Sequence, residues 1–234
     1  MHSSPVIDVI IPAYNEEASI GLVVAEIDRS LVRDIVVCNN NSTDRTAQVG
    51  EAAGAVVVNE PRPGYGSACL RGLAYVAATR PPAEEPDIIV FLDGDHSDYP
   101  AEMADLVRPI VEDGMDLVIG SRATGELEPG SMTPQQVFGN WLATNLIRLL
   151  YGYEFTDLGP FRAVRYPALK KMQMRDPDFG WTVEMQVRAA KMGLRCTEIP
   201  VRYRRRIGNS KISGTIRGTV LAGHKILWTI FKMI

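Results

Sequence analysis

Two carboxylates separated by one glycine follow a short apolar run. Residues 88–92 read Ile-Ile-Val-Phe-Leu, and Asp93, Gly94 and Asp95 come directly after them. An unbroken apolar run is typical of a strand buried on both faces, so the carboxylates would stand at its exit. Such oxygen ligands bind hard cations, Mg²⁺ or Mn²⁺, which usually share them with substrate phosphates. The alternative is an ordinary surface turn in which Asp95 caps the next helix.

Two further polar loops, 12–17 and 39–44, follow apolar runs earlier in the chain. Each is followed by apolar residues spaced three and four apart, which predicts a helix. Alternating strands and helices predict an α/β fold with a Rossmann-like, mostly parallel central sheet flanked by helices, and ligands bind such sheets beyond the carboxyl ends of the strands. The loops 12–17, 39–44 and 93–98 should therefore meet at that edge, and this favours the metal-site hypothesis. No glycine loop fits a dinucleotide or P-loop fingerprint.

The same patterns give the approximate positions of the elements. We expect strands at 6–11, 34–38, 55–59, 88–92, 116–122, 163–164 and 195–203. We expect helices at 16–29, 44–53, 67–79, 101–113, 135–152, 182–192 and 215–234. In the helix at 135–152, Trp141 and the leucine and isoleucine positions should face inward.

Three other ionisable residues are candidates for chemistry. Arg122 ends a predicted strand, where its guanidinium could bind phosphate oxygens in a bidentate manner. The alternative is an exposed arginine in a loop. Asp157 lies in a compact turn and Glu184 on a predicted helix, and either could act as a general base toward a hydroxyl acceptor. Glu184 could equally be a carboxylate on the surface of that helix.

Charge is distributed unevenly along the 234 residues, although the net charge is only −3. Residues 1–161 carry 9 basic and 24 acidic groups, a balance of −15, whereas residues 162–234 carry 16 basic and 4 acidic groups, a balance of +12. Either the two halves neutralise each other across the fold, or a basic surface faces phosphates or an anionic membrane. We expect no nucleic-acid partner.

The two ends of the chain bear on its location. The start, Met-His-Ser-Ser-Pro, lacks the basic and apolar regions of a signal peptide, and no uncharged apolar stretch of about 20 residues could span a bilayer. We expect a protein that is cytoplasmic, either free or peripheral on the cytoplasmic face of the membrane. The C-terminal helix is amphipathic, with Trp228 and Phe231 among its apolar residues, and could lie in the membrane interface. Alternatively it packs on the sheet or against a second subunit of a homo-oligomer.

Seven motifs occur in the order found in one enzyme family. They are Ile-Ile-Pro-Ala-Tyr-Asn-Glu (10–16), Asn-Asn-Asn-Ser-Thr-Asp (39–44), Gly-Tyr-Gly-Ser-Ala (64–68), Asp-Gly-Asp (93–95), Ile-Gly-Ser-Arg (119–122), Asp-Leu-Gly-Pro-Phe-Arg (157–162) and Gly-Asn-Ser-Lys (208–211). The chain resembles the family 2 inverting glycosyltransferases, which have the GT-A fold, and among them the polyprenyl-phosphate sugar synthases of the dolichyl-phosphate mannose synthase type. The resemblance implies a GT-A catalytic domain at 1–212, followed by the amphipathic helix at 213–234.

The resemblance also implies roles for residues at matching positions. Nucleotide binding is implied for Pro12, Tyr14, Glu16, Asn40, Gly66 and Asp93. Asp93 and Asp95 are implied to bind Mg²⁺ or Mn²⁺ across the sugar diphosphate. Acceptor or phosphate binding is implied for Arg122, Arg162, Arg205, Arg206 and Lys211. The expected catalytic set is Asp93, Asp95, Arg122, Asp157 and Glu184.

Three features depart from the family pattern. Asn40 stands where the family usually has Asp, Ser97 stands where the mannose synthases often have Gln, and the chain ends at Ile234, whereas many relatives continue into transmembrane helices. Guanine offers two adjacent donors to a carboxylate, so a neutral Asn40 favours UDP-sugars over GDP-sugars.

The leading hypothesis is a metal-dependent enzyme that transfers a hexose of the glucose or mannose class from a nucleotide diphosphate to a polyprenyl phosphate. A phosphate acceptor is already ionised at neutral pH and needs no strong general base. One alternative is the same fold acting on a soluble or lipid hydroxyl. Another is a sugar-nucleotide-binding subunit without activity, and the intact pair of Asp93 and Asp95 argues against it.

Overall fold

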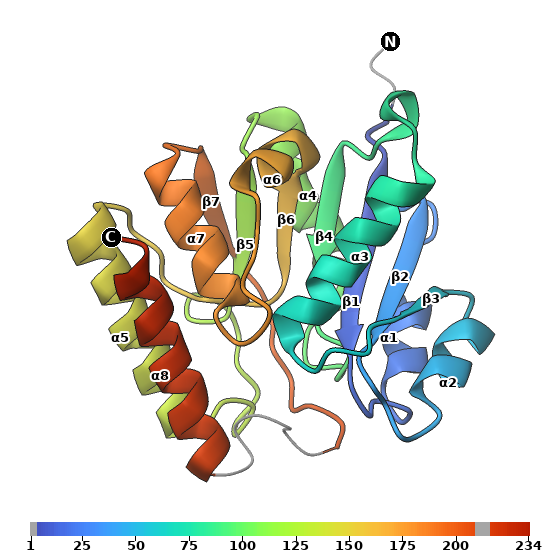
Figure 1. The fold of residues 1–234 in the computed structure, drawn as a ribbon, viewed down its shortest axis with the longest axis horizontal. Helices are drawn as coiled ribbons and strands as arrows, with labels where there is room; N and C mark the ends of the chain where they lie inside the picture. Colours follow the sequence, from blue (N-terminus) through green and yellow to red (C-terminus); the bar gives the residue numbers. More distant parts are fainter. Residues whose placement is uncertain (1–3, 209–215) are drawn as a thin grey trace.

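The computed structural model describes residues 4–208 and 216–234, with a seven-stranded sheet at its centre (Figure 1). The strands are β1 (Ile7–Ala13), β2 (Asp34–Asn39), β3 (Val56–Asn59), β4 (Ile88–Phe91), β5 (Leu117–Ser121), β6 (Arg162–Arg165) and β7 (Cys196–Pro200). Their order across the sheet is β3-β2-β1-β4-β6-β5-β7. β6 is antiparallel to both of its neighbours, and the other pairs are parallel. The predicted α/β fold with a mostly parallel sheet is confirmed.

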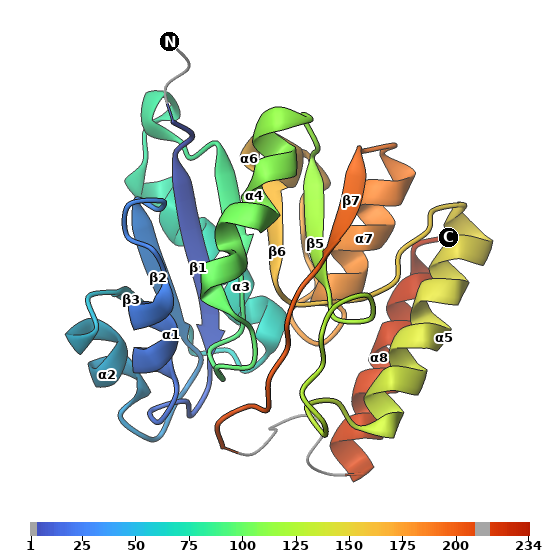
Figure 2. The ribbon, with the colours of Figure 1, turned by 180° about the vertical axis from the view of Figure 1, so that it is seen from behind.

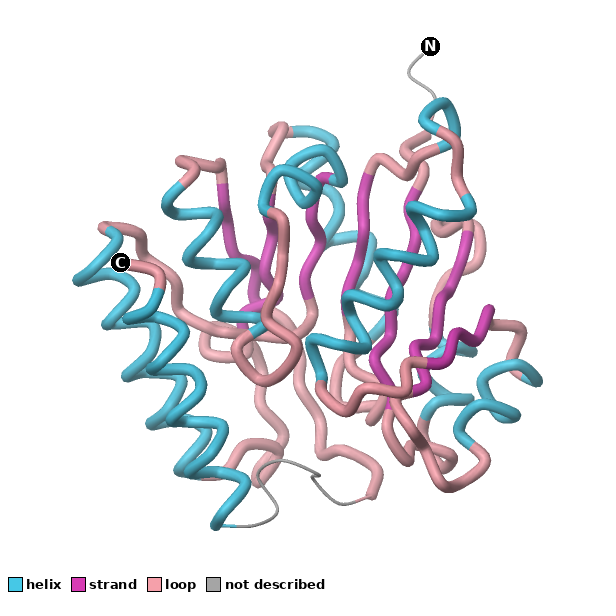
Figure 3. Tube along the Cα trace, in the orientation of Figure 1, coloured by secondary structure: helices cyan, strands magenta, loops and turns pink. Residues whose placement is uncertain are grey.

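The central strands are apolar because both of their faces are covered. Every residue of β1, β4 and β5 is buried. In the parallel register Ala13 lies opposite Asn39, and Ile10 lies opposite Phe91. The loops after β1, β2 and β4 therefore leave from one edge of the sheet, where Figure 3 shows many loops gathered. This edge holds the three polar loops singled out in the sequence.

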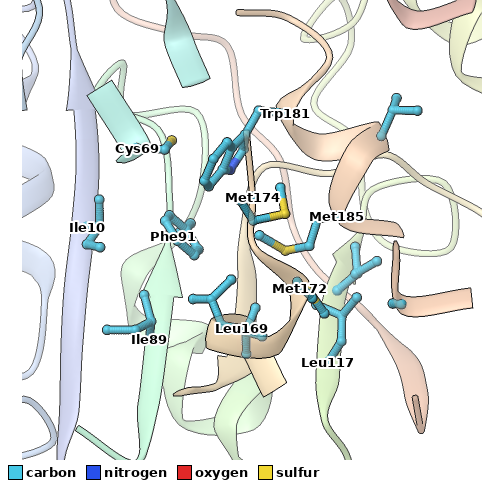
Figure 4. Close-up of a cluster of buried hydrophobic side chains, with 14 of the residues drawn as sticks. Ile10, Cys69, Ile89, Phe91, Leu117, Leu169, Met172, Met174, Trp181 and Met185 are labelled. Carbon is cyan, nitrogen blue, oxygen red and sulfur yellow. The ribbon is translucent and has the colours of Figure 1, made fainter. Parts of the chain in front are cut away.

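Helices cover both faces of the sheet (Figures 1 and 2). They are α1 (Ile20–Glu26), α2 (Thr46–Ala52), α3 (Tyr65–Thr79), α4 (Met103–Glu112), α5 (Pro134–Tyr151), α6 (Tyr166–Met172), α7 (Trp181–Lys191) and α8 (Ile216–Lys232), with 3-10 turns η1 (Pro82–Glu84) and η2 (Pro100–Glu102). Side chains of α1 and α4 fill the core on one face, and those of α3, α6 and α7 fill the core on the other. In the second core Phe91 meets the edge of Trp181 at 5.9 Å between ring centroids, beside three methionines (Figure 4).

Several elements differ from the prediction. The helix predicted at 16–29 is shorter in the structure, where α1 spans Ile20–Glu26, and the 3-10 turns η1 and η2 were not predicted. The helix α6 was not predicted, and it follows β6 without a loop because Pro167 lies in its first turn, where a missing N–H costs little. The strand β7 ends at Pro200 rather than at residue 203, since proline has no N–H to continue the ladder.

The helices α5 and α8 pack side by side at the β7 end of the molecule (Figures 1 and 2). α5 begins with a capping box in which Thr133 and Gln136 exchange hydrogen bonds, and it ends at Gly152 in a left-handed conformation. The prediction that Trp141 and the leucine and isoleucine positions face inward is wrong for Trp141 and Leu149, which are 58% and 78% exposed, and right for Ile147, which is completely buried. In the described part of the chain, no helix is long and apolar enough to cross a membrane.

Candidate active site

A cavity of about 480 Å³, here called the first pocket, lies beyond the carboxyl ends of β1, β2 and β4. Its lining residues are Pro12, Ala13, Tyr14, Glu16, Asn40, Asn41, Pro63, Gly64, Tyr65, Ala68, Asp93, Gly94, Asp95, Asp178, Phe179 and Arg206. The cavity thus brings together five of the six residues predicted to bind nucleotide, as well as both predicted metal ligands.

Asp93 and Asp95 lie in the loop after β4, but their surroundings differ. The Oδ1 atom of Asp93 is buried and has no hydrogen-bond partner among the described residues. Burial, together with the charge of Asp95, raises the pKa of Asp93 to about 6. The Oδ1 atom of Asp95 accepts a hydrogen bond of 2.9 Å from Ser97 N, and its Oδ2 atom lies 3.0 Å from Arg206 Nη1. Asp93 therefore has one unsatisfied carboxylate oxygen, and Asp95 is paired with a cation.

The unsatisfied oxygen fits a divalent cation. A buried carboxylate oxygen without a partner is costly, and a cation there would remove the cost. The described residues contain no group of three or more His, Cys, Asp or Glu side chains placed to hold a metal ion. A cation held by Asp93 and Asp95 would therefore take its remaining ligands from water and from substrate phosphates, which is the usual arrangement for Mg²⁺.

Asn40 uses its side chain to hold the neighbouring loop. Its Nδ2 donates to the carbonyl oxygens of Glu60 and Arg62 at 3.1 and 2.6 Å, and its Oδ1 accepts from Gly64 N at 2.8 Å. Both amide donors are thus used within the protein, while Asn40 still lines the first pocket. Only the second lone pair of Oδ1 remains for a base donor.

Gly66 is absent from the lining of both pockets described here, although it was predicted to bind nucleotide. A Cβ at this position would lie 2.0 Å from the carbonyl oxygen of Asp176. The glycine is therefore required because α3 starts in close contact with the 176–177 backbone. The neighbouring Ser67 N donates to Pro177 O at 2.8 Å and fastens the same contact.

A second pocket, of about 250 Å³, adjoins the first. Its lining residues are Tyr65, Asp93, Arg122, Met132, Gln135, Gln136, Gly139, Asn140, Leu158, Pro160, Phe179, Thr182, Tyr203, Arg206, Ala222, Gly223 and Ile226. Tyr65, Asp93, Phe179 and Arg206 line both cavities. The site therefore has two compartments that meet at the predicted metal ligand Asp93.

Arg122 lines the second pocket, as expected of a residue at the end of a strand, but it is already paired. Its Nε and Nη2 atoms each lie 2.7 Å from a carboxylate oxygen of Asp157, which is a bidentate arrangement. The side chains of Arg122 and Asp157 are only 12% and 1% exposed. Despite the opposing effect of burial, Asp157 raises the pKa of Arg122. The structure thus joins two residues that the sequence assigned to separate roles.

Glu184 and Arg162 are structural rather than solvent-facing. The Glu184 carboxylate accepts hydrogen bonds from Arg175 N and Asp176 N and pairs with Arg188, and it lines neither pocket. Arg162 is completely buried and donates to the carbonyl oxygens of residues 158, 159 and 182. Burial lowers its pKa to about 10. Both groups are thus engaged within the protein, and the base role of Glu184 and the phosphate-binding role of Arg162 remain predictions.

The other two predicted phosphate ligands lie outside the pockets described here or outside the described residues. Arg205 is largely exposed, lines neither pocket, and its Nε donates to Pro129 O at 2.7 Å. Lys211 lies outside the residues that the structure describes. Among the described residues of the predicted acceptor- or phosphate-binding set, Arg122 and Arg206 therefore line a pocket.

Three residues of the site were missed by the sequence interpretation. Tyr65 lines both pockets, and its flanking glycines were a signal, because they let α3 approach the 176–177 backbone. Phe179 lines both pockets and Asp178 lines the first, yet both lie in a loop without a recognisable motif. Their position depends on Glu184, which holds the start of that loop.

Comparisons with known proteins agree with this architecture. Solved structures of similar fold include glucosyl-3-phosphoglycerate synthase from Mycobacterium tuberculosis in complex with Mn²⁺, uridine-diphosphate-glucose and phosphoglyceric acid. That structure has a TM-score of 0.75 and 24% sequence identity, with coverage of 98% of this chain and 79% of the other. At this identity the similarity shows the fold alone.

Sequence relatives give the family. An uncharacterized glycosyltransferase of Mycobacterium tuberculosis is 37% identical over 92% of this chain and 94% of its own length. A dolichyl-phosphate hexose transferase of Haloferax volcanii is 32% identical over 91% of this chain and 89% of its own length. The profile described as Glycosyl transferase family 2 matches residues 8–173. The chain therefore belongs to glycosyl transferase family 2.

Proposed function

We propose that the chain transfers a hexose from a UDP-sugar to a polyprenyl phosphate at a membrane surface, with Mg²⁺ or Mn²⁺ as cofactor. The observation that carries the proposal is the meeting of two pockets at Asp93. The first pocket contains the residues predicted to hold the nucleoside and diphosphate. The second would hold the acceptor, so that the anomeric carbon lies between them.

Asp93 and Asp95 are the groups that would hold the cation. Bound there, it would act as a Lewis acid and neutralise charge on the departing diphosphate. Asp93 has the unsatisfied Oδ1 oxygen, and Asp95 is oriented by its hydrogen bond from Ser97. The solved neighbour named above, which has a similar fold, was crystallised with Mn²⁺ and UDP-glucose, and this supports the choice of cofactor and donor.

The contacts of the predicted bases favour a phosphate acceptor. Asp157 is engaged by both arms of Arg122, and Glu184 is engaged by two backbone N–H groups and Arg188. A hydroxyl acceptor would need one of them to remove its proton. A phosphate is ionised at neutral pH and attacks without that help. The occupied carboxylates therefore support the polyprenyl-phosphate hypothesis over the hydroxyl alternative.

An apolar groove gives the acceptor a place for its hydrocarbon tail. A cavity of about 470 Å³ between α5 and α8 shares Gln135, Gly139, Gly223 and Ile226 with the second pocket. Its other lining residues, Pro134, Phe138, Leu142 and Leu227, are apolar. The acceptor phosphate would sit near Arg206 while the isoprenoid chain follows the groove.

The outer surface of the same two helices fits a membrane interface. Phe138, Trp141, Trp228 and Phe231 are each at least 50% exposed. Aromatic side chains of this kind partition into the headgroup region of a bilayer. The H. volcanii relative, whose name specifies a dolichyl phosphate, also supports a lipid acceptor.

A donor and acceptor panel tests the proposal. The protein would be incubated with UDP- and GDP-sugars and Mn²⁺, with and without detergent-dispersed undecaprenyl phosphate, and free nucleotide would be measured. We expect UDP release that depends on both the lipid and the metal. Equal release with the free alcohol undecaprenol would favour a hydroxyl acceptor. Tight UDP-sugar binding without release in any mixture would favour a binding subunit.

A further inference from the structure

The segment of residues 204–207 is fastened to the predicted metal loop by main-chain contacts. Ile207 N donates to Asp95 O at 2.9 Å, and Arg204 N donates to Ser97 O at 3.0 Å. The Arg204 side chain adds a hydrogen bond of 2.6 Å to His96 O. None of these three contacts uses a carboxylate oxygen of the metal loop, so each can persist when the carboxylates change partner.

Arg206 of this segment forms an ion pair with Asp95, one of the two predicted metal ligands. Its Nη1 lies 3.0 Å from Asp95 Oδ2, and the two side chains are 27% and 6% exposed. The unsatisfied Oδ1 of Asp93 belongs to the same two-carboxylate site. The guanidinium thus supplies one positive charge at a site that fits a divalent cation. Two cations cannot share a single carboxylate without mutual repulsion.

We propose that Arg206 is the counter-cation of Asp95 in the metal-free enzyme and is displaced when the divalent cation binds. The proposal rests on the function proposed above. The main-chain contacts hold the 204–207 segment in place, so the exchange requires rotation of the Arg206 side chain alone. Because Arg206 also lines the second pocket, the released guanidinium faces the acceptor compartment.

The exchange would make the affinity of the second pocket for an acceptor phosphate depend on the bound metal ion. Among the residues that the structure describes, the charged ones that line the second pocket are Asp93, Arg122 and Arg206. Arg122 is held in a bidentate pair by Asp157, so its positive charge is already compensated. The cation available to an acceptor phosphate is therefore Arg206, and it is released by the metal. An acceptor phosphate would therefore bind more tightly once the metal is bound.

Mn²⁺ titrations of the 234-residue chain without nucleotide or acceptor test the exchange, with free Mn²⁺ followed by electron paramagnetic resonance. Arg206→Gln removes the competing charge and should bind Mn²⁺ at least about threefold more tightly than the parent, the size expected for a partly exposed ion pair. Arg206→Lys keeps the charge and should behave like the parent. Arg202→Gln is the matched control, because Arg202 pairs with Glu102 outside both pockets.

Unchanged or weaker Mn²⁺ binding by Arg206→Gln would overturn the proposal, and so would equal tightening by Arg202→Gln. A second measurement uses the parent protein and does not depend on the folding of a variant. Phenylglyoxal labelling, resolved by mass spectrometry, should modify Arg206 faster with Mn²⁺ than without it, and equal rates would contradict the exchange. Since neither experiment contains a sugar donor or a lipid, an error in the proposed acceptor would leave both results unaffected.

Discussion

Arg122 and Asp157 hold each other through two hydrogen bonds of 2.7 Å, from Nε to Oδ2 and from Nη2 to Oδ1. The pair lies beside the second pocket, and both side chains are largely buried. It places a compensated charge where the sequence suggested a free anion-binding arginine. This pair therefore forms part of the wall of the second pocket. In the proposal above, the positive charge that becomes available to the acceptor there is that of Arg206.

Breaking the pair should destabilise the fold. Asp157→Asn would leave the Arg122 guanidinium buried without a counter-charge, at a cost of about 3 kcal/mol in the free energy of unfolding. Urea denaturation of the parent, of each single variant and of the double variant Asp157→Asn/Arg122→Met measures the coupling. The double variant should lose less than the sum of the single losses. Parent-like stability of Asp157→Asn with loss of turnover alone would instead identify Asp157 as a catalytic base.

The metal-free protein should respond to pH through Asp93. Burial and the charge of Asp95 raise its pKa from 3.8 to about 6, so between these values the folded state binds a proton that the unfolded state does not. Stability from this group therefore increases as the pH falls through about 6. Mn²⁺ competes with the same proton, so its affinity should fall over this range. Urea denaturation at several pH values checks the trend in stability, and Mn²⁺ titrations at the same pH values check the trend in affinity. Asp93→Asn should remove the part of the pH dependence of stability that comes from this carboxylate. A parent affinity for Mn²⁺ that is flat between pH 5 and 7.5 would contradict the assignment.

UDP should bind more tightly than GDP in the presence of Mn²⁺, because Asn40 cannot supply a charged acceptor to the two donors of guanine. Calorimetry on the parent protein tests this expectation. Asn40→Asp is a poor test, since it would remove the donors to Glu60 O and Arg62 O and loosen the loop that they hold. Tighter binding of GDP than of UDP would show that residues other than Asn40 determine the preference between guanine and uracil.

Replacing exposed aromatic residues on α5 and α8 should weaken membrane binding. Trp141→Ser combined with Trp228→Ser removes two side chains that are 58% and 56% exposed, and so should leave stability nearly unchanged. Flotation with liposomes that contain anionic lipid should fall several-fold. Leu22→Ser is the matched control, because Leu22 is 48% exposed on α1, away from the α5–α8 pair (Figure 1). Equal flotation of all three proteins, or none at low salt, would remove the membrane role.

The sequence predicted the sheet and the position of the site because both depend on local patterns. Apolar runs such as 88–92 identify buried strands, and parallel strands bring the loops after them to one edge. This reasoning placed Asp93, Asp95 and Tyr14 in one cavity without knowledge of any distance. The order of strands β4, β6 and β5 was not accessible, since the pairing of short apolar runs depends on contacts far apart in the sequence.

The roles of charged residues were predicted less well because the sequence does not show which group each charged side chain contacts. Arg122 meets Asp157, which is 35 residues away, and Arg162 meets carbonyl groups of a turn and of α7. A guanidinium that binds phosphate and one that satisfies buried carbonyl groups look alike in a sequence. The periodicity of α5 likewise showed apolar positions, but not that Trp141 would lie on the exposed side.

A divalent cation held by Asp93 and Asp95 would connect these carboxylates to the donor diphosphate. UDP binding should be measured by thermal melting and calorimetry with Mn²⁺ and with EDTA, on the parent and on Asp93→Asn and Asp95→Ala. With Mn²⁺, UDP at 100 times its dissociation constant should stabilise the parent by about 2.7 kcal/mol, and with EDTA much less. Both variants should lose the difference between Mn²⁺ and EDTA. If either variant binds UDP with Mn²⁺ as tightly as the parent, the metal site lies elsewhere and the assignment of Asp93 and Asp95 as its ligands is wrong.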